Sequence, residues 1–128
     1  MDQLRVLVVD DEQELVDAVV ERLQLRGIAA DGVTTGSAAL KRLAGGSFDV
    51  VLLDVKMPAP GGLDVLREVN QCCPSIAVVL VTGHGSLQDA KTGMRLGASD
   101  YIMKPFDIDA LVGTMLKAAV AKGVQIGE

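Results

Sequence analysis

The fold is decided by residues 50–58, which have the sequence VVLLDVKMP. Four consecutive apolar residues lead directly into Asp54, and Pro58 begins a loop rich in proline and glycine. A short, uninterrupted apolar run bounded by turn residues is typical of a strand covered on both faces, as in a parallel sheet packed between helices. Ligands bind to such sheets outside the carboxyl ends of the strands. The stretch therefore predicts a buried strand that presents Asp54 at a functional edge.

The composition suits one globular domain, because 128 residues with 49% hydrophobic side chains can build a single core. Two Phe, one Tyr and no Trp make that core aliphatic and argue against an aromatic platform for single-stranded nucleic acid. The net charge of −5 comes without a basic stripe, and the apolar runs are too short to cross a bilayer. No leader-like segment precedes the first apolar run, which begins at Leu4. We therefore expect a soluble, cytoplasmic protein that contacts neither nucleic acid nor membrane.

The cysteine and histidine content excludes a zinc site of ordinary ligand spacing, since the chain has two Cys and one His. Cys72 and Cys73 are adjacent, and neighbouring cysteines rarely meet the geometry of a disulfide. We therefore expect two reduced thiols.

Strand-like and helix-like patterns alternate along the whole chain. Apolar runs predict strands at residues 4–9, 28–33, 48–53, 76–81 and 101–103. Helical spacing of apolar residues, with caps and terminating Gly or Pro, predicts helices within residues 15–26, 37–43, 63–73, 86–96 and 107–122. The second strand is the least apolar and is expected near an edge of the sheet. This alternation is typical of right-handed βαβ units that cover both faces of a parallel sheet.

Polar side chains close each long strand and should meet at one edge of the sheet. Asp10 and Asp11 follow the first strand, Asp54 the third, Thr82 the fourth and Lys104 the fifth. Three carboxylates held close together cannot all stay ionised unaided, so the site requires a cation or a shared proton. Magnesium is the natural occupant, because it prefers oxygen ligands and is usually held by one or two carboxylates together with a phosphate.

The same set of residues predicts phosphoryl chemistry. A carboxylate such as Asp54 can act as a nucleophile and form an aspartyl phosphate, while Thr82 and Lys104 contact the oxygens of the transferred group. Each residue also has an ordinary structural interpretation: Asp10 and Asp11 can cap a helix, Thr82 can merely end a strand and Lys104 can be solvated. Their joint occurrence at successive strand ends favours the phosphoryl site.

In order, spacing and residue type, essentially the whole chain resembles a receiver domain of two-component response regulators. The motifs that match are the acidic pair Asp10-Asp11, the phosphoacceptor Asp54, Met57-Pro58, the switch hydroxyl Thr82, the switch aromatic Tyr101 and Lys104-Pro105. The resemblance implies an α/β fold: a doubly wound five-stranded parallel sheet of order 2-1-3-4-5, flanked by five helices as in flavodoxin.

The resemblance also implies roles that composition does not show. Asp11 and Asp54 would bind Mg²⁺ directly and Asp10 would bind it through water, with the backbone carbonyl of Lys56 as a further ligand. Lys104-Pro105 is expected to be a cis peptide bond.

Three further residues are expected at the rim of the site. They are Met57, Gly83 and His84. Gly83 should leave the approach of a phosphoryl group open. His84 is the sole imidazole, but receiver relatives take the phosphoryl group from a histidine of a partner kinase, so we interpret it as a loop residue that tunes water access.

The function implied is a phosphorylation-dependent signalling switch within a two-component phosphorelay. A sensor histidine kinase or histidine phosphotransfer protein would donate to Asp54, and the chain would catalyse only its own phosphorylation and slow dephosphorylation. Thr82 and Tyr101 would then change the face made by residues 86–96, 101–103 and 107–122, which controls an output domain, a partner or a homodimer. Residues 1–122 are expected to form the receiver and residues 123–128 a tail or the start of a linker.

Two rival functions remain open at this point. The first is a dehalogenase-like phosphatase or phosphotransferase, but such enzymes carry a second acid two residues after the nucleophile, where this chain has Lys56. The second is an inert binding module, against which the intact set of acids, Thr82 and Lys104 argues. Tyr101 likewise has an alternative interpretation as an ordinary core ring with its hydroxyl at the surface.

Overall fold

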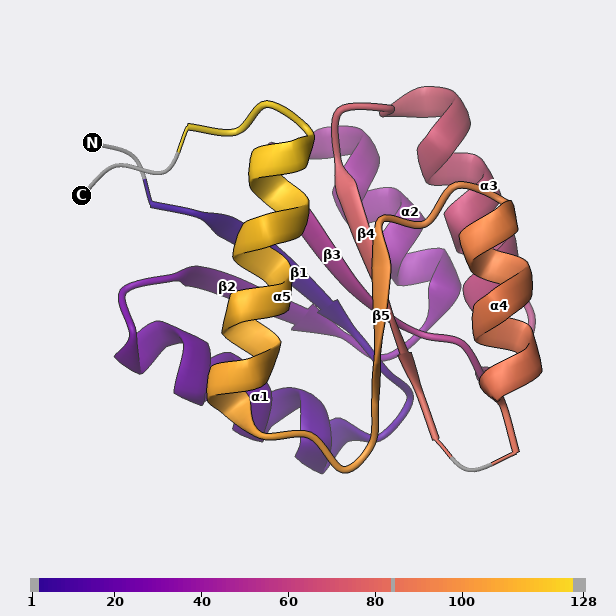
Figure 1. The fold of residues 1–128 in the computed structure, drawn as a ribbon, viewed down its shortest axis with the longest axis horizontal. Helices are drawn as coiled ribbons and strands as arrows, with labels where there is room; N and C mark the ends of the chain where they lie inside the picture. Colours follow the sequence, from indigo (N-terminus) through magenta and orange to yellow (C-terminus); the bar gives the residue numbers. More distant parts are fainter. Residues whose placement is uncertain (1–2, 84, 126–128) are drawn as a thin grey trace.

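The structure is a computed structural model, and it describes residues 3–83 and 85–125. Five strands and five helices alternate along these residues (Figure 1). The strands are β1 (Arg5–Val9), β2 (Ala29–Val33), β3 (Val50–Asp54), β4 (Ala77–Thr82) and β5 (Asp100–Met103). The helices are α1 (Gln13–Leu25), α2 (Gly36–Gly45), α3 (Gly62–Cys72), α4 (Leu87–Arg95) and α5 (Ile108–Ala121). The predicted alternation is confirmed.

The strands form one parallel sheet in the order β2-β1-β3-β4-β5. This order confirms the predicted doubly wound fold and places β2, the least apolar strand, at an edge. The chain winds outward in one direction from β1 to β2 and then in the other direction from β3 to β5. Because the connections diverge between β1 and β3, a crevice opens at the carboxyl ends of these two strands.

Helices cover both faces of the sheet (Figure 1). Side chains alternate along each strand, so Val6 and Val8 of β1 join the core beneath α1 and α5, whereas Leu7 and Val9 join the core beneath α2 and α3. The central strands β3 and β4 are buried at every position. Burial on both sides explains why their sequences are apolar throughout instead of alternating.

The structure corrects the expectation for the cysteines. Cys72 and Cys73 are joined as a disulfide between neighbouring residues where α3 ends, so the prediction of two reduced thiols is wrong for this structure. Cys73 follows the last residue of α3 with a non-helical backbone conformation, φ −142° and ψ 62°. Within the described ranges, no helix combines the length and the apolar character that a membrane span requires.

Gly62, the first residue of α3, lets this helix begin directly against the end of β3. A Cβ atom at Gly62 would lie 2.4 Å from the carbonyl oxygen of Asp54 and 2.8 Å from the Cα of Val55. Both are backbone atoms, which cannot rotate away as a side chain can. The close approach fixes the segment that leaves Asp54.

We expect Gly62→Ala to lower the free energy of unfolding by about 1–3 kcal/mol, because the added methyl group has no space beside the backbone of β3. Urea denaturation followed by circular dichroism measures this change. Gly113→Ala is the matched control: Gly113 lies in α5 with open space around it, so alanine should stabilise the protein by up to about 1 kcal/mol. Equal effects of the two substitutions would contradict the close approach.

Candidate functional site

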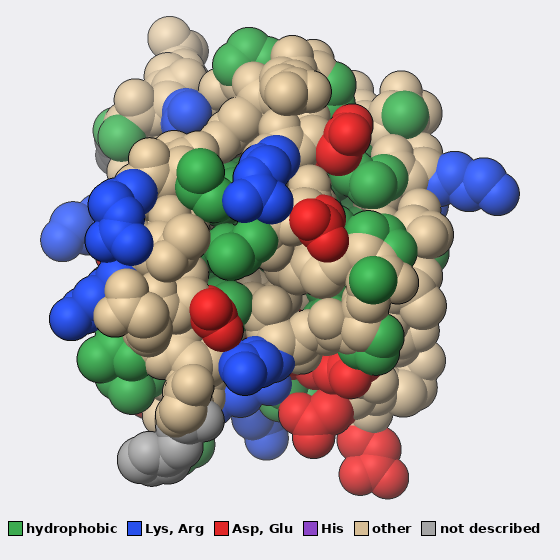
Figure 2. Space-filling model, turned by 90° about the vertical axis from the view of Figure 1, so that its right-hand side faces the viewer, with side chains coloured by type: hydrophobic (Ala, Val, Ile, Leu, Met, Phe, Trp, Pro, Cys, Tyr) green, Lys and Arg blue, Asp and Glu red, His purple; other side chains and the backbone are tan. Residues whose placement is uncertain are grey.

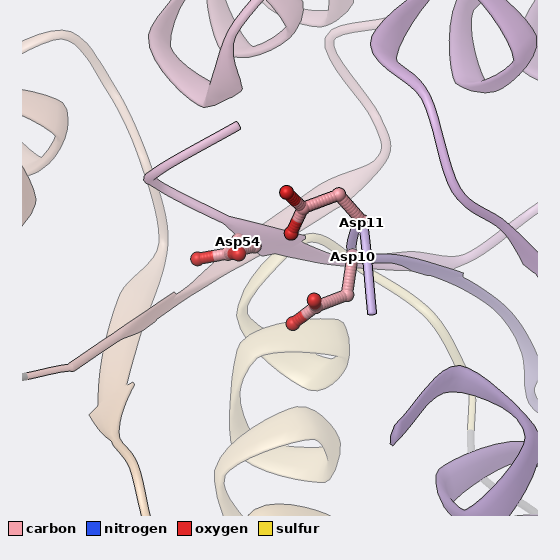
Figure 3. Close-up of side chains that lie close together, drawn as sticks. All are labelled: Asp10, Asp11 and Asp54. Atoms are coloured by element: carbon pink, nitrogen blue, oxygen red, sulfur yellow. The ribbon is translucent and has the colours of Figure 1, made fainter. Parts of the chain in front are cut away.

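Three carboxylates meet at the carboxyl ends of β1 and β3 (Figure 3). Asp10 and Asp11 directly follow β1, and Asp54 is the last residue of β3. An oxygen of each of the three carboxylates lies within 4.8 Å of those of the others. Asp10 and Asp54 are buried, whereas Asp11 is exposed. The strand register thus brings together acids that are more than 40 residues apart in the chain.

Lys104 forms ion pairs with the acidic cluster. Its Nζ lies 2.8 Å from Oδ2 of Asp10, 3.3 Å from Oε1 of Glu12 and 3.8 Å from Oδ2 of Asp54. The amide of Lys104 also donates to the carbonyl of Thr82 at 2.7 Å, which fixes the start of the connection from β5 to α5. The bond between Lys104 and Pro105 is cis, as expected from the resemblance.

Burial dominates the electrostatics of Asp54. Desolvation, and after it the charge of Asp10, raise the pKa of Asp54 to about 6, while Lys104 and a hydrogen bond of 3.2 Å from the amide of Lys56 act in the opposite direction. Partial burial acts to lower the pKa of Lys104, but its hydrogen bond to Asp10 and the charge of Asp54 outweigh burial and raise it. Ionisation of Asp54 at neutral pH therefore lowers the stability of the folded protein, and a further cation nearby would reduce this loss.

The donor set fits Mg²⁺. Carboxylate oxygens are the ligands that this ion prefers, and Asp10, Asp11 and Asp54 supply three of them around one point at the edge of the sheet. The partly solvated position also suits an ion that keeps several of its waters.

Thr82 ends β4 and is fully buried. Its hydroxyl oxygen lies 2.5 Å from the hydroxyl oxygen of Ser86 and 3.4 Å from the carbonyl of Gly83. The residue before it, Val81, is paired in register with Asp54, so Thr82 lies one position beyond Asp54 on the neighbouring strand.

The remaining predicted residues lie around this centre. The side chain of Lys56 is exposed, with its Nζ 3.9 Å from the carboxylate of Asp89, which agrees with a solvated side chain. Met57 and Gly83 are half-buried, and nothing lies within 4 Å of a Cβ placed on Gly83. Tyr101 is half-buried and packs against the core beneath α2 and α3. His84 lies outside the described residues.

Two residues of the site were not predicted from the sequence. Glu12 directly follows the acidic pair but was not assigned a role, although it shares Lys104 with Asp10. Ser86 is the first residue of the helix predicted at residues 86–96, and no local signal in the sequence connects its hydroxyl with Thr82.

A hollow of about 430 Å³ lies beside the cluster, between α1 and the connection from β5 to α5. Apolar side chains of Leu15, Val19 and Phe106 line it, and Gly83 and Lys104 form its border with the acidic site. A molecule that docks in this hollow therefore lies next to Lys104.

Comparisons with known proteins identify a matching family and related structures. A family model described as the response regulator receiver domain matches residues 6–116. The transcriptional regulatory protein CutR of Streptomyces coelicolor is 40% identical over 109 residues, which are 85% of this chain and 50% of CutR. The transcriptional regulatory protein YkoG of Bacillus subtilis, itself uncharacterised, is 32% identical over 98% of this chain and 55% of its own. The chain thus spans about half the length of these relatives.

Solved structures show the same fold. A response regulator receiver domain protein from Clostridium thermocellum superimposes with a TM-score of 0.89 at 32% identity, covering 93% of this chain and 96% of that one. NtrX from Brucella abortus, solved in complex with ADP, gives a TM-score of 0.89 at 30% identity, covering 94% of this chain and 28% of NtrX.

The raised pKa of Asp54 predicts a pH-dependent gain in stability on neutralising this residue. A carboxyl group whose pKa rises from 3.8 to about 6 on folding stabilises the folded state fully below pH 4, and this contribution is lost as the pH rises through 6. In Mg²⁺-free buffer, Asp54→Asn should therefore gain up to about 3 kcal/mol over the wild type between pH 4 and pH 7.

Urea denaturation at successive pH values in the presence of EDTA measures this gain. Asp17→Asn, which removes an exposed carboxylate from α1, is the control for the loss of one charge. A difference between Asp54→Asn and the wild type that stays constant from pH 4 to pH 7 would show that burial does not penalise the carboxylate.

Proposed function

The chain belongs to the response regulator receiver domain family of two-component systems, and we propose that Asp54 accepts its phosphoryl group from a histidine kinase or a histidine phosphotransfer protein. Membership implies phosphorylation-dependent signalling. The single observation that carries the assignment of Asp54 is its position: a buried carboxylate between two acids and one lysine at the divergence of β1 and β3.

The proposed reaction is an in-line transfer. A carboxylate oxygen of Asp54 bonds to phosphorus while the bond from phosphorus to the partner's imidazole nitrogen breaks, and that nitrogen keeps the electron pair. Ionised Asp54 is the nucleophile, which a pKa of about 6 permits at neutral pH. Lys104 moves from Asp10 and Glu12 towards the phosphoryl oxygens, and Thr82 donates its hydroxyl hydrogen to them.

Magnesium would be held directly by Asp11 and Asp54, through water by Asp10, and by the backbone carbonyl of Lys56. When bound, this ion supplies positive charge that neutralises the phosphoryl oxygens. The acids would hold it, and Lys104, whose Nζ lies 3.8 Å from Oδ2 of Asp54, would supply further positive charge. Together the two cations would offset the negative charge of the carboxylates and part of that of the phosphoryl oxygens.

A signalling role is favoured over turnover of substrates. The named relatives are transcriptional regulatory proteins and not classical enzymes. Lys56 occupies the position of the second acid of a dehalogenase-like phosphatase, and its exposed side chain is paired loosely with Asp89. We propose that the chain catalyses only its own phosphorylation and slow dephosphorylation.

We propose the hollow beside Lys104 as the place where the donor docks. Its apolar lining by Leu15, Val19 and Phe106 suits a helix of the histidine-bearing partner, and its border at Lys104 brings such a helix next to Asp54. An imidazole on that helix would then face the acceptor.

The output face is proposed to be formed by α4, β5 and α5. Leu87 and Met94 of α4 and Met103 of β5 are large hydrophobic residues exposed to solvent. Lys91 and Arg95 lie on the same helix. Figure 2 views the side of the molecule on which α3 and α4 lie, where hydrophobic side chains are scattered among charged ones. A movement of Thr82 would be coupled to this face through a change in the position of Tyr101 of β5.

We propose residues 1–122 as the receiver unit and residues 123–128 as a tail or the start of a linker, since α5 ends at Ala121 and Lys122 caps it. The relatives are about twice as long, and we propose that an output domain or a separate partner reads the switch. A cytoplasmic location is proposed because the family works with histidine kinases that transfer phosphate there.

Incubation with Mg²⁺ and acetyl phosphate, a small phosphodonor, tests the acceptor. Intact-mass measurement should show one added phosphoryl group in the wild type and in Asp17→Asn, and none in Asp54→Asn. Released phosphate should accumulate slowly. An Asp54→Asn variant that gains the group to the same extent as the wild type would place the acceptor elsewhere, and fast turnover of unrelated phosphate esters would favour the enzyme.

Magnesium should also stabilise the unphosphorylated protein by mass action. At ten times its dissociation constant, a ligand that binds only the folded state contributes about 1.4 kcal/mol. Thermal unfolding in Mg²⁺ and in EDTA should show this difference for the wild type and for Asp17→Asn, and should show less than about half of it for Asp11→Asn at the same Mg²⁺ concentration. An unchanged difference in Asp11→Asn would rule out Asp11 as a ligand.

A further inference from the structure

Ser86 occupies the N-cap position of α4 without capping the helix. A serine at this position usually accepts a hydrogen bond from an amide of the first helical turn. The side chain of Ser86 makes no such bond. It is instead 2% exposed and faces Thr82 and Gly83. A conventional capping role therefore does not account for this hydroxyl.

The hydrogen-bond partners of Ser86 favour Thr82 as the donor between the two hydroxyls. Its Oγ accepts from the amide of Gly83 at 3.0 Å, donates to the carbonyl of Gly83 at 2.9 Å and lies 2.5 Å from Oγ1 of Thr82. A serine hydroxyl has one hydrogen and two lone pairs. We assign the hydrogen of Ser86 to the carbonyl of Gly83, so the hydrogen between the two hydroxyls is assigned to Thr82. The alternative acceptor for Thr82, the carbonyl of Gly83, lies 3.4 Å away and is weaker.

We propose that Ser86 is a positioning residue that keeps the Thr82 hydroxyl engaged and thereby sets how readily Asp54 takes up a phosphoryl group. This inference rests on the proposed function, in which Thr82 donates to the phosphoryl oxygens. Thr82 has one hydroxyl hydrogen, so it must leave Ser86 before it can bind the phosphoryl group. The bond between the two hydroxyls therefore opposes the phosphorylated arrangement.

The same exchange loosens one end of α4. Ser86 joins the start of this helix to β4 through Thr82, and this bond is lost when Thr82 turns to the phosphoryl group. The other end remains attached, because Asn70 of α3 donates to the carbonyl of Leu96 at 2.7 Å. Gly93 also holds the helix close to the sheet: a Cβ there would lie 2.3 Å from a methyl carbon of Leu80. We therefore expect the first turn of α4 to move, while its C-terminal end stays attached to α3.

Binding of beryllofluoride, a phosphoryl analogue, in the presence of Mg²⁺ tests the positioning role. Ser86→Ala removes the partner that competes for Thr82, so the apparent dissociation constant of beryllofluoride should fall roughly two- to tenfold, as expected for one hydrogen bond. The amide and the carbonyl of Gly83 lose their hydrogen bonds with the Ser86 hydroxyl in both the free and the bound protein, so this loss cancels in the comparison. Amide chemical shifts measured by NMR follow the titration.

Thr82→Val provides the background that separates positioning from general destabilisation. Valine keeps the branched shape of Thr82 without its hydroxyl, so adding Ser86→Ala to Thr82→Val should change the dissociation constant by less than about 1.5-fold. Ser75→Ala, at an exposed serine just before β4, is the matched control and should bind as the wild type does.

The outcomes are distinguishable. If the wild type binds beryllofluoride and Ser86→Ala binds it equally or more weakly, the positioning role is overturned and the proposed function stands. If Ser86→Ala changes the dissociation constant equally in the wild type and in Thr82→Val, the positioning role is also overturned, because Ser86 would then act independently of Thr82. If the wild type fails to bind, the proposed function is wrong and the role of Ser86 falls with it.

Discussion

A carboxylate buried at the end of a central strand is the constraint on which the site depends. Asp54 is 6% exposed because β3 lies in the middle of the sheet and α3 begins directly against its end. Burial and the charge of Asp10 both disfavour its ionised form, and Lys104 offsets only part of this cost. The fold thus holds a carboxylate that gains stability from added positive charge, which fits the proposed metal ion beside the lysine.

Both groups that would contact a phosphoryl group are engaged elsewhere in this structure. Lys104 binds Asp10 and Glu12 more closely than it approaches Asp54, and the hydroxyl of Thr82 is hydrogen-bonded with that of Ser86. The proposed phosphorylation of Asp54 would therefore compete with existing interactions of both Lys104 and Thr82. A modest free-energy difference between two sets of partners is what a switch requires, because it lets one covalent change alter the population of each arrangement.

The strands and helices of this protein could be predicted from local sequence, whereas the state of its cysteines could not. Buried strands and helix spacing were predicted well, because two-sided burial leaves an unbroken apolar run that is visible locally. The acids, Thr82 and Lys104 could be placed near one another because parallel strands end at the same edge of a sheet. Adjacent Cys72 and Cys73 were predicted wrongly, since the direction of the chain after α3 decides whether their sulfur atoms meet.

By itself, the sequence determined the fold class, the order of the elements and the identity of the residues that gather at the strand ends. These features follow from local periodicity and from the resemblance of motifs over the whole chain. Only the tertiary structure decided the partners of each polar group: that Glu12 shares Lys104, that Ser86 turns from its helix to Thr82, and that burial raises the pKa of Asp54. Hydrogen bonds and desolvation depend on the positions of atoms distant in sequence, and no local pattern of residues encodes those positions.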